Sequence, residues 1–273
     1  MKLMTLVENT SAVQGFACVH GLSFYLETGK QKILFDLGPD DTIFANAAAA
    51  GIDLSEVGLV IISHGHYDHG GALRKFLEVN HKAKIYVRDC GFAKYASVSS
   101  GSLRWIGLDK ELKNHPQVMH TEKDVMIGDG LRLFSGVTGR KFFSPANQLL
   151  KEEKDGNLVC DAFLHEQNLI VKEGNKKILI AGCAHNGIVN ILEKFEELEG
   201  RMPDAAIGGF HLNPPSAGAE VPEELLDGIS RQLLTWPVQY YTCHCTGLVP
   251  YEGLKKRMGS RVFYLGAGSI LEV

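Results

Sequence analysis

The apolar positions of this chain fall into short runs separated by glycine and charged residues, a pattern that predicts alternating strands and helices. In the first third, residues 22–28 and 31–36 have the character of two hairpin strands, and the apolar run 57–63 predicts a buried strand. We expect strands at 22–28, 31–36, 57–63 and 85–87, and helices at 43–50 and 72–79.

The last hundred residues repeat this order of strands and helices. Strands are expected at 168–173, 177–181, 238–242 and 262–265, and helices at 188–198, 222–234 and 251–258. Because strands with helices on both sides pack as layers, the pattern predicts an α/β (α+β) sandwich. The periodicity weakens between about 90 and 160, which predicts an irregular insert or lid within a single domain spanning 1–273.

The composition is typical of a globular protein and argues against a membrane protein or a nucleic-acid-binding protein. A chain of 273 residues with 45% hydrophobic and 22% charged residues can form one globular domain. The net charge of -4 gives no bulk attraction for nucleic acid, and no apolar stretch approaches the ~20 residues of a membrane span. The first residues lack the pattern of a signal peptide, and the six cysteines form no disulfide-dense framework. We therefore expect a cytoplasmic protein with reduced thiols that binds neither nucleic acid nor membranes.

The most informative segment is the hexapeptide His64-Gly-His66-Tyr-Asp68-His69, which directly follows the predicted buried strand 57–63. Two histidines two residues apart in an extended segment can point the same way, and imidazole nitrogen suits zinc, iron or manganese. Asp68 and His69 follow where the chain turns and can serve a second metal. The alternative is a loop that is polar by chance, which this spacing disfavours.

Three more histidines follow strand-like runs and can complete a metal site: His185, His211 and His244. Each alone is more typical of a satisfied polar residue, but a metal held by one loop needs ligands from distant segments. Cys183, Cys243 and Cys245 form a weak zinc-thiolate pattern, because Cys-x-Cys is tighter than the usual spacing. Packing in the floor of the site is the simpler interpretation, with a ligand or bridging role for Cys183 left open.

These motifs resemble those of the metallo-β-lactamase superfamily. The resemblance rests on the hexapeptide, on Asp36 at the acidic position on an early strand, and on the segments 182–190, 207–212 and 244–247. The last three resemble a subgroup that includes 7,8-dihydropterin-6-methyl-4-(β-D-ribofuranosyl)aminobenzene-5′-phosphate synthases and many metal-dependent hydrolases. The resemblance implies a four-layered αββα sandwich with metals at the edge where loops of both halves meet.

The resemblance also implies a set of metal ligands. They are His64, His66, Asp68, His69, His185 and His244. His165 is the rival of His185 as third ligand of the first metal. Cys183 stands where the superfamily has its bridging aspartate, a departure that bears on the second metal.

The implied cofactors are two divalent metal ions, with zinc expected and iron or manganese as alternatives. The expected function is a metal-dependent hydrolase that uses a metal-bound hydroxide on a small anionic phosphoester, ester or lactone. Asp68 would orient the nucleophile, and His211 would contact the substrate or donate a proton. Arg140 and Lys141 are the candidates for binding its anionic group.

Two other functions remain in view: a dihydropterin-linked synthase, as the subgroup name implies, and a binding protein with a degenerate metal site. The expected partner is a small-molecule substrate. Homo-oligomerisation is left open by the sequence.

Overall fold

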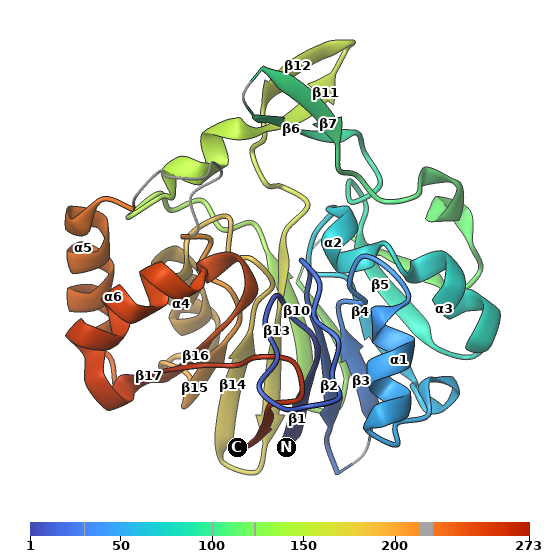
Figure 1. The fold of residues 1–273 in the computed structure, drawn as a ribbon, viewed down its shortest axis with the longest axis horizontal. Coiled ribbons are helices and arrows are strands. Elements are labelled where there is room, and N and C mark those ends of the chain that lie inside the picture. Colours follow the sequence, from blue (N-terminus) through green and yellow to red (C-terminus); the bar gives the residue numbers. More distant parts are fainter. Residues whose placement is uncertain (30, 100, 123, 213–220) are drawn as a thin grey trace. The chain divides into compact units, whose positions relative to one another are not determined.

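The chain forms two units, each built on one large β-sheet (Figure 1). The computed structural model describes residues 1–29, 31–99, 101–122, 124–212 and 221–273. Unit 1 consists of Met1–Tyr95, Ile106–Lys123 and Leu265–Val273. Unit 2 consists of Ala96–Trp105 and Asp124–Tyr264.

The sheet of unit 1 has the strand order β18-β1-β2-β3-β4-β5-β8. Its strands are β1 (Lys2–Val7), β2 (Ser23–Glu27), β3 (Lys32–Phe35), β4 (Leu59–Ile61), β5 (Lys84–Arg88), β8 (Val118–Thr121) and β18 (Ile270–Glu272). The helices of this unit are α1 (Thr42–Ala49), α2 (Tyr67–Gly70) and α3 (Leu73–Val79). Strands β3, β4, β5 and β8 run parallel, so their carboxyl ends share one edge of the sheet.

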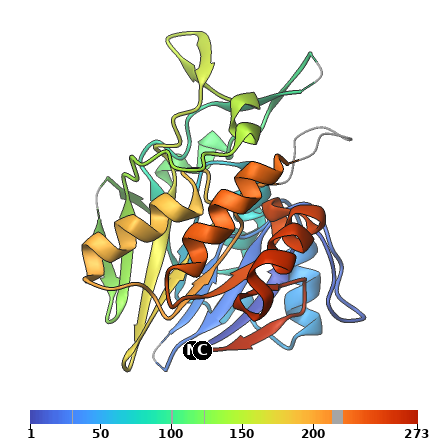
Figure 2. The ribbon, with the colours of Figure 1, turned by 90° about the vertical axis from the view of Figure 1, so that its left-hand side faces the viewer.

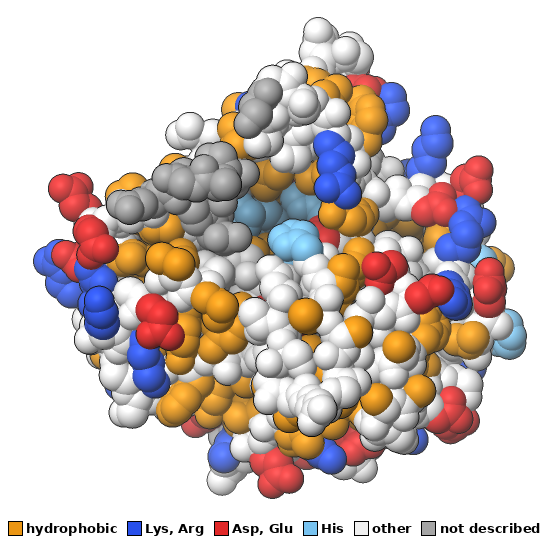
Figure 3. Space-filling view, in the orientation of Figure 1, with side chains coloured by type: hydrophobic (Ala, Val, Ile, Leu, Met, Phe, Trp, Pro, Cys, Tyr) orange, Lys and Arg blue, Asp and Glu red, His pale blue; other side chains and the backbone are white. Residues whose placement is uncertain are grey.

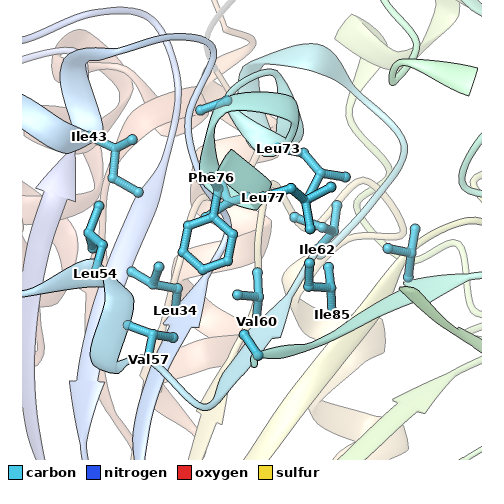
Figure 4. Packing of buried hydrophobic residues seen from close by; sticks show 14 of the residues in the cluster. Leu34, Ile43, Leu54, Val57, Val60, Ile62, Leu73, Phe76, Leu77 and Ile85 are labelled. Carbon is cyan, nitrogen blue, oxygen red and sulfur yellow. The ribbon is translucent and has the colours of Figure 1, made fainter. Parts of the chain in front are cut away.

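The core of unit 1 fixes the strand that carries the hexapeptide (Figure 4). Phe76 of α3 packs with Leu34, Val60 and Ile85 of three adjacent strands, and all four side chains are fully buried. Every residue of β4 is buried, as expected for a central parallel strand covered on both faces. This packing leaves little freedom for the loop that begins at the end of β4.

The sheet of unit 2 has the strand order β17-β16-β15-β14-β13-β10-β9. Its strands are β9 (Val125–Gly128), β10 (Leu131–Ser135), β13 (Gln167–Glu173), β14 (Lys176–Ile180), β15 (Ala205–Ile207), β16 (Gln239–Thr242) and β17 (Val262–Tyr264). Figure 2 shows its helices side by side over one face of the sheet: α4 (Ile188–Glu199), α5 (Glu223–Leu234) and α6 (Leu248–Met258).

Buried residues of these helices, among them Phe195, Leu233 and Leu254, form one core with Leu179 and Tyr240 of the sheet. Strands β14, β15 and β16 are parallel neighbours. Their carboxyl ends therefore deliver three consecutive loops to the same edge of the sheet, as is usual for ligand sites in parallel sheets.

The segment 90–160 differs from the predicted irregular insert, because its described residues contain strands. β8 joins the sheet of unit 1, and β9 and β10 join that of unit 2. A further sheet is formed by β12 (Asn157–Cys160), β11 (Leu150–Lys154), β6 (Tyr95–Ser99) and β7 (Ser102–Trp105), in that order. These strands have at most five residues and β7 and β12 are exposed throughout, so their sequences show no apolar alternation.

The other predicted strands and helices are confirmed to within a few residues, whereas β1 and β18 were not predicted. Among the described residues, none of the helices has the length and apolar character needed to cross a membrane.

Candidate metal site

The hexapeptide occupies the carboxyl end of β4, where the chain turns into the short helix α2. His64, His66, Asp68 and His69 are all buried. The ring of His64 lies 4.6 Å from that of His66 and 4.1 Å from that of His69, measured between centroids. A Cβ on Gly65 would meet Gly91 O at 2.4 Å, so the residue between the two histidines must be small. Unit 1 thus brings three imidazoles and a carboxylate together in one loop.

Two of these imidazoles are oriented by hydrogen bonds at Nδ1. His69 Nδ1 lies 2.7 Å from Asp36 Oδ2, and His64 Nδ1 lies 2.8 Å from Ser63 Oγ. Asp36 also accepts hydrogen bonds from the Ser63 amide and hydroxyl, each at 2.7 Å. The carboxylate of Asp36 therefore fixes the start of the loop and directs Nε2 of His69 away from itself, the arrangement typical of metal-binding histidines.

Asp68 has two histidine neighbours in unit 1. Its Oδ2 lies 3.3 Å from His20 Nε2 and 3.8 Å from His69 Nε2. The His20 side chain is 57% exposed, whereas that of Asp68 is 12% exposed. His66 packs edge-on against the Tyr95 ring, 5.9 Å between centroids. His20 was not identified from the sequence, because it lies outside any motif.

In unit 2, His185 lies in the loop between β14 and α4 and is held on two sides. Its Nδ1 is 3.0 Å from Asn147 Oδ1, and Asn147 Nδ2 donates to its carbonyl oxygen at 2.8 Å. The ring stacks on Phe163, with centroids 4.5 Å apart and planes within 1°. The amide contact at Nδ1 and the stacking on Phe163 together fix the orientation of the ring.

A buried carboxylate, Glu166, clamps the same loop. Its two oxygens accept hydrogen bonds from the His185 amide at 2.5 Å and the Asn186 amide at 3.1 Å, and Asn186 Nδ2 donates at 2.8 Å. Burial raises the pKa of Glu166, and these hydrogen bonds oppose that rise. Glu166 therefore positions the backbone on either side of the His185 side chain.

His165, the rival third ligand, has a different environment. Its Nε2 lies 2.9 Å from Asp161 Oδ2, and both side chains are 1% exposed. Asp161 also accepts a hydrogen bond from the Phe163 amide at 2.7 Å. This histidine belongs to a buried pair with a carboxylate, whereas His185 is oriented by a neutral amide.

The loops after β15 and β16 carry His211 and His244. The Phe210 amide donates to Thr246 Oγ1 at 2.8 Å, which connects the two loops. His211 lies against His185, 4.1 Å between ring centroids. The thiol of Cys245 donates to the carbonyl oxygen of Cys183 at 3.4 Å.

The Cys245 thiol has an altered acidity. Burial alone raises its pKa, but contacts with Cys183 and His211 and the charge of His244 bring the pKa well below its usual range. Cys183, His211 and Cys245 have their ligand atoms within 4.8 Å of one another.

Left-handed backbone occurs at several residues of these loops. Asp36 has φ 64°, Ala184 54°, His211 48° and His244 49°. Such conformations are unfavourable for residues other than glycine and gather at functional sites.

The predicted anion-binding pair, Arg140 and Lys141, is exposed on unit 2. Arg140 Nη1 donates to Gly139 O at 2.7 Å, and its guanidinium lies 5.1 Å from the centre of the Phe143 ring. Lys141 Nζ is 2.6 Å from Glu193 Oε1. The guanidinium therefore keeps further donors for an anion, whereas the ammonium already has a carboxylate partner.

Three residues that support the candidate ligands were missed in the sequence: Ser63, Asn147 and Glu166. Ser63 could have been found from its place between the buried strand and His64. Asn147 and Glu166 contact the His185 loop across 38 and 19 residues, and no local pattern signals such contacts.

Comparison with known proteins agrees with the motif and the fold. Residues 17–98 match the model of the metallo-beta-lactamase superfamily. An uncharacterized protein of Methanocaldococcus jannaschii is 29% identical, over 89% of each chain. The 7,8-dihydropterin-6-methyl-4-(beta-D-ribofuranosyl)-aminobenzene-5'-phosphate synthase of the same organism is 26% identical, over 100% of this chain and 96% of its own.

Among solved structures, a metal-dependent hydrolase of the β-lactamase superfamily is 28% identical, with a TM-score of 0.80 over 100% of this chain and 99% of its own. The fold predicted from the sequence is thereby confirmed. The chain has the metallo-β-lactamase fold and resembles, within that superfamily, the dihydropterin ribofuranosylaminobenzene phosphate synthases.

Proposed function

We propose that this protein is a metal-dependent hydrolase of a small anionic ester, phosphoester or lactone. The proposed ligands for two divalent metal ions, with zinc expected, are His64, His66, Asp68, His69, His185 and His244. The similarity to a solved metal-dependent hydrolase supports the reaction class.

One observation carries the proposal: three candidate ligands are each oriented through Nδ1. Ser63 holds His64, Asp36 holds His69 and Asn147 holds His185. In every case the contact at Nδ1 fixes the plane of the ring, and Nε2 would be the ligand atom. Hydrogen bonding of the second nitrogen is the usual support of a metal-binding imidazole, so the donors fit a divalent metal.

Bound divalent metals lower the pKa of a water ligand and polarise the oxygen of an ester or phosphoester. The residues of the chain would supply position and charge. Asp68 would accept a hydrogen bond from the attacking water and so orient it, with its carboxylate held by His20 at 3.3 Å. Asp36 would keep the His69 ring fixed through the reaction.

The anionic group of the substrate is assigned to Arg140 and Lys141. Arg140 would make the stronger contact, because Lys141 must first exchange its ion pair with Glu193. On the face drawn in Figure 3, basic side chains (blue) alternate with acidic ones (red). This mixture supports a small substrate over a nucleic acid, whose binding relies on clustered positive charge.

The second candidate function is a pterin-linked synthase. It is favoured by the full-length similarity to the named synthase. The third, a binding protein with a degenerate site, predicts that the purified chain holds only traces of metal.

Activity of metal-loaded and chelator-stripped protein separates these candidates. We expect the loaded protein to hydrolyse at least one substrate of a panel of phosphodiesters, esters and lactones, and expect stripping to abolish this. His64→Gln should lose the activity, and His81→Gln, which changes an exposed histidine, should keep it. Consumption of a dihydropterin pyrophosphate without hydrolysis of the panel would support the synthase instead.

A further inference from the structure

Three side chains of unit 2 that can bind a metal do not belong to the ligand set proposed above. Two of them lie on the same loops as proposed ligands. Cys183 follows β14, His211 follows β15 and Cys245 follows β16. Because these parallel strands are adjacent, each contributes one donor at the same edge of the sheet. The sulfur and nitrogen atoms lie within 4.8 Å of one another. Both cysteines are thiols and are buried.

The imidazole of His211 is the unusual member. Both of its ring nitrogens are buried, and neither makes a hydrogen bond of normal geometry with the residues that the structure describes; the Cys245 thiol contacts the ring. Buried polar atoms are nearly always paired, and an unpaired one calls for an explanation such as an ion. His211 also has a left-handed backbone, φ 48°, which turns the residue at a cost in strain.

The local glycine makes room for this cluster. A Cβ on Gly209 would lie 2.3 Å from Cys245 Sγ, so any larger residue would displace the sulfur. The loop after β15 can therefore pass directly beside the thiol only because residue 209 is glycine.

We propose that Cys183, His211 and Cys245 form a zinc site of the Cys2His type, next to His185 and His244, whose ligand atoms also lie within 4.8 Å of that of Cys183. Zinc is bound well by thiolate and imidazole, and three protein ligands leave a fourth position for water. Binding would release the thiol protons to solvent, since zinc binds the thiolate form. The site gives His211 a metal-binding role in place of the substrate contact expected from its sequence position.

The consequence is structural support for the candidate ligands nearby. Cys183 and His185 share one loop, and Cys245 directly follows His244. A zinc ion at this position would tie the loops after β14, β15 and β16 together. It would thereby hold both histidines in place.

X-ray absorption at the zinc edge tests the proposal on the unmodified, reduced protein. We expect a sulfur shell at ~2.3 Å. The shell should persist in His64→Gln, whose lost ligand belongs to the other set, and in Cys243→Ala, which removes a buried thiol outside the cluster. A zinc-loaded protein with only nitrogen and oxygen neighbours would overturn the inference.

Cobalt substitution separates the three donors. We expect a thiolate-to-cobalt absorption band that is lost or at least halved in Cys245→Ser and in Cys183→Ser, and shifted in His211→Gln. A band that depends on Cys183 and is unchanged in Cys245→Ser would contradict the site, because Cys183 alone would then be a ligand. A different result would contradict the proposed function, namely a metal content of His64→Gln equal to that of the wild type. The two proposals can therefore be tested separately.

Discussion

Asp36 and His69 are joined through a 2.7 Å contact between Oδ2 and Nδ1, and both side chains are fully buried. The same carboxylate accepts two hydrogen bonds from Ser63, the residue that contacts His64. One aspartate therefore controls the orientation of two candidate ligands. Asp36 directly follows β3, and its left-handed backbone, φ 64°, turns the chain away from the direction of that strand.

The first prediction concerns this carboxylate. Asp36→Asn keeps the shape of the side chain but weakens the orientation of His69, so we expect metal affinity to fall by about 10–100-fold. Competition with a chromophoric chelator measures the affinity. Asp40→Asn, at an exposed position, is the control and should bind as the wild type does. Equal affinity in both variants would rule out a supporting role for Asp36.

The second prediction separates the two rival ligands. His185→Gln should remove close to one equivalent of metal, because Asn147 orients its imidazole through Nδ1, as is usual for a metal-binding histidine. His165→Gln should leave the metal content unchanged and lower stability, because it breaks the buried pair with Asp161. Elemental analysis of both variants gives the answer, and the opposite order would make His165 the ligand.

The third prediction concerns Glu166. In Glu166→Gln one oxygen becomes an NH2 group that faces amide donors, so a buried hydrogen bond is lost. We expect the free energy of unfolding of the metal-free protein to fall by about 1–3 kcal/mol. Urea unfolding measures it, with Glu196→Gln on the exposed face of α4 as control. If Glu166→Gln lowers the free energy of unfolding no more than Glu196→Gln does, the hydrogen bonds of Glu166 do not stabilise the fold.

The fourth prediction is that the stability of the protein depends on pH through Glu199, the last residue of α4. Glu199 Oε2 lies 2.8 Å from both Lys172 Nζ and Lys177 Nζ. Burial alone raises the pKa of Glu199, but the hydrogen bonds and charges of the two lysines bring it below its ordinary value of 4.5. Since the folded pKa is depressed, the stabilisation is present above pH 4.5 and is lost as the pH falls through the folded pKa.

Glu199→Gln should therefore reduce the fall in stability on acidification. Melting temperatures at pH 7 and at pH values below 4.5 measure the difference, with Glu197→Gln as an exposed control. Parallel pH profiles for wild type and Glu199→Gln would disprove this contribution.

The position of the hexapeptide could be predicted because a buried strand and its following loop are both local patterns in the sequence. The edge of the second sheet was predictable for the same reason, since His185, His211 and His244 each follow an apolar run. The contacts of Asn147 and Glu166 could not be predicted, because they depend on how distant segments fold together. The strands β7 and β12 were missed because exposed strands carry no apolar alternation.

The metal content of the protein purified without chelator tests the central claim most directly. We predict close to two equivalents of divalent metal per chain in addition to any zinc bound through sulfur, and a loss of at least one equivalent in His64→Gln but none in His81→Gln. Trace metal in the wild type, or equal content in the wild type and His64→Gln, would contradict the account.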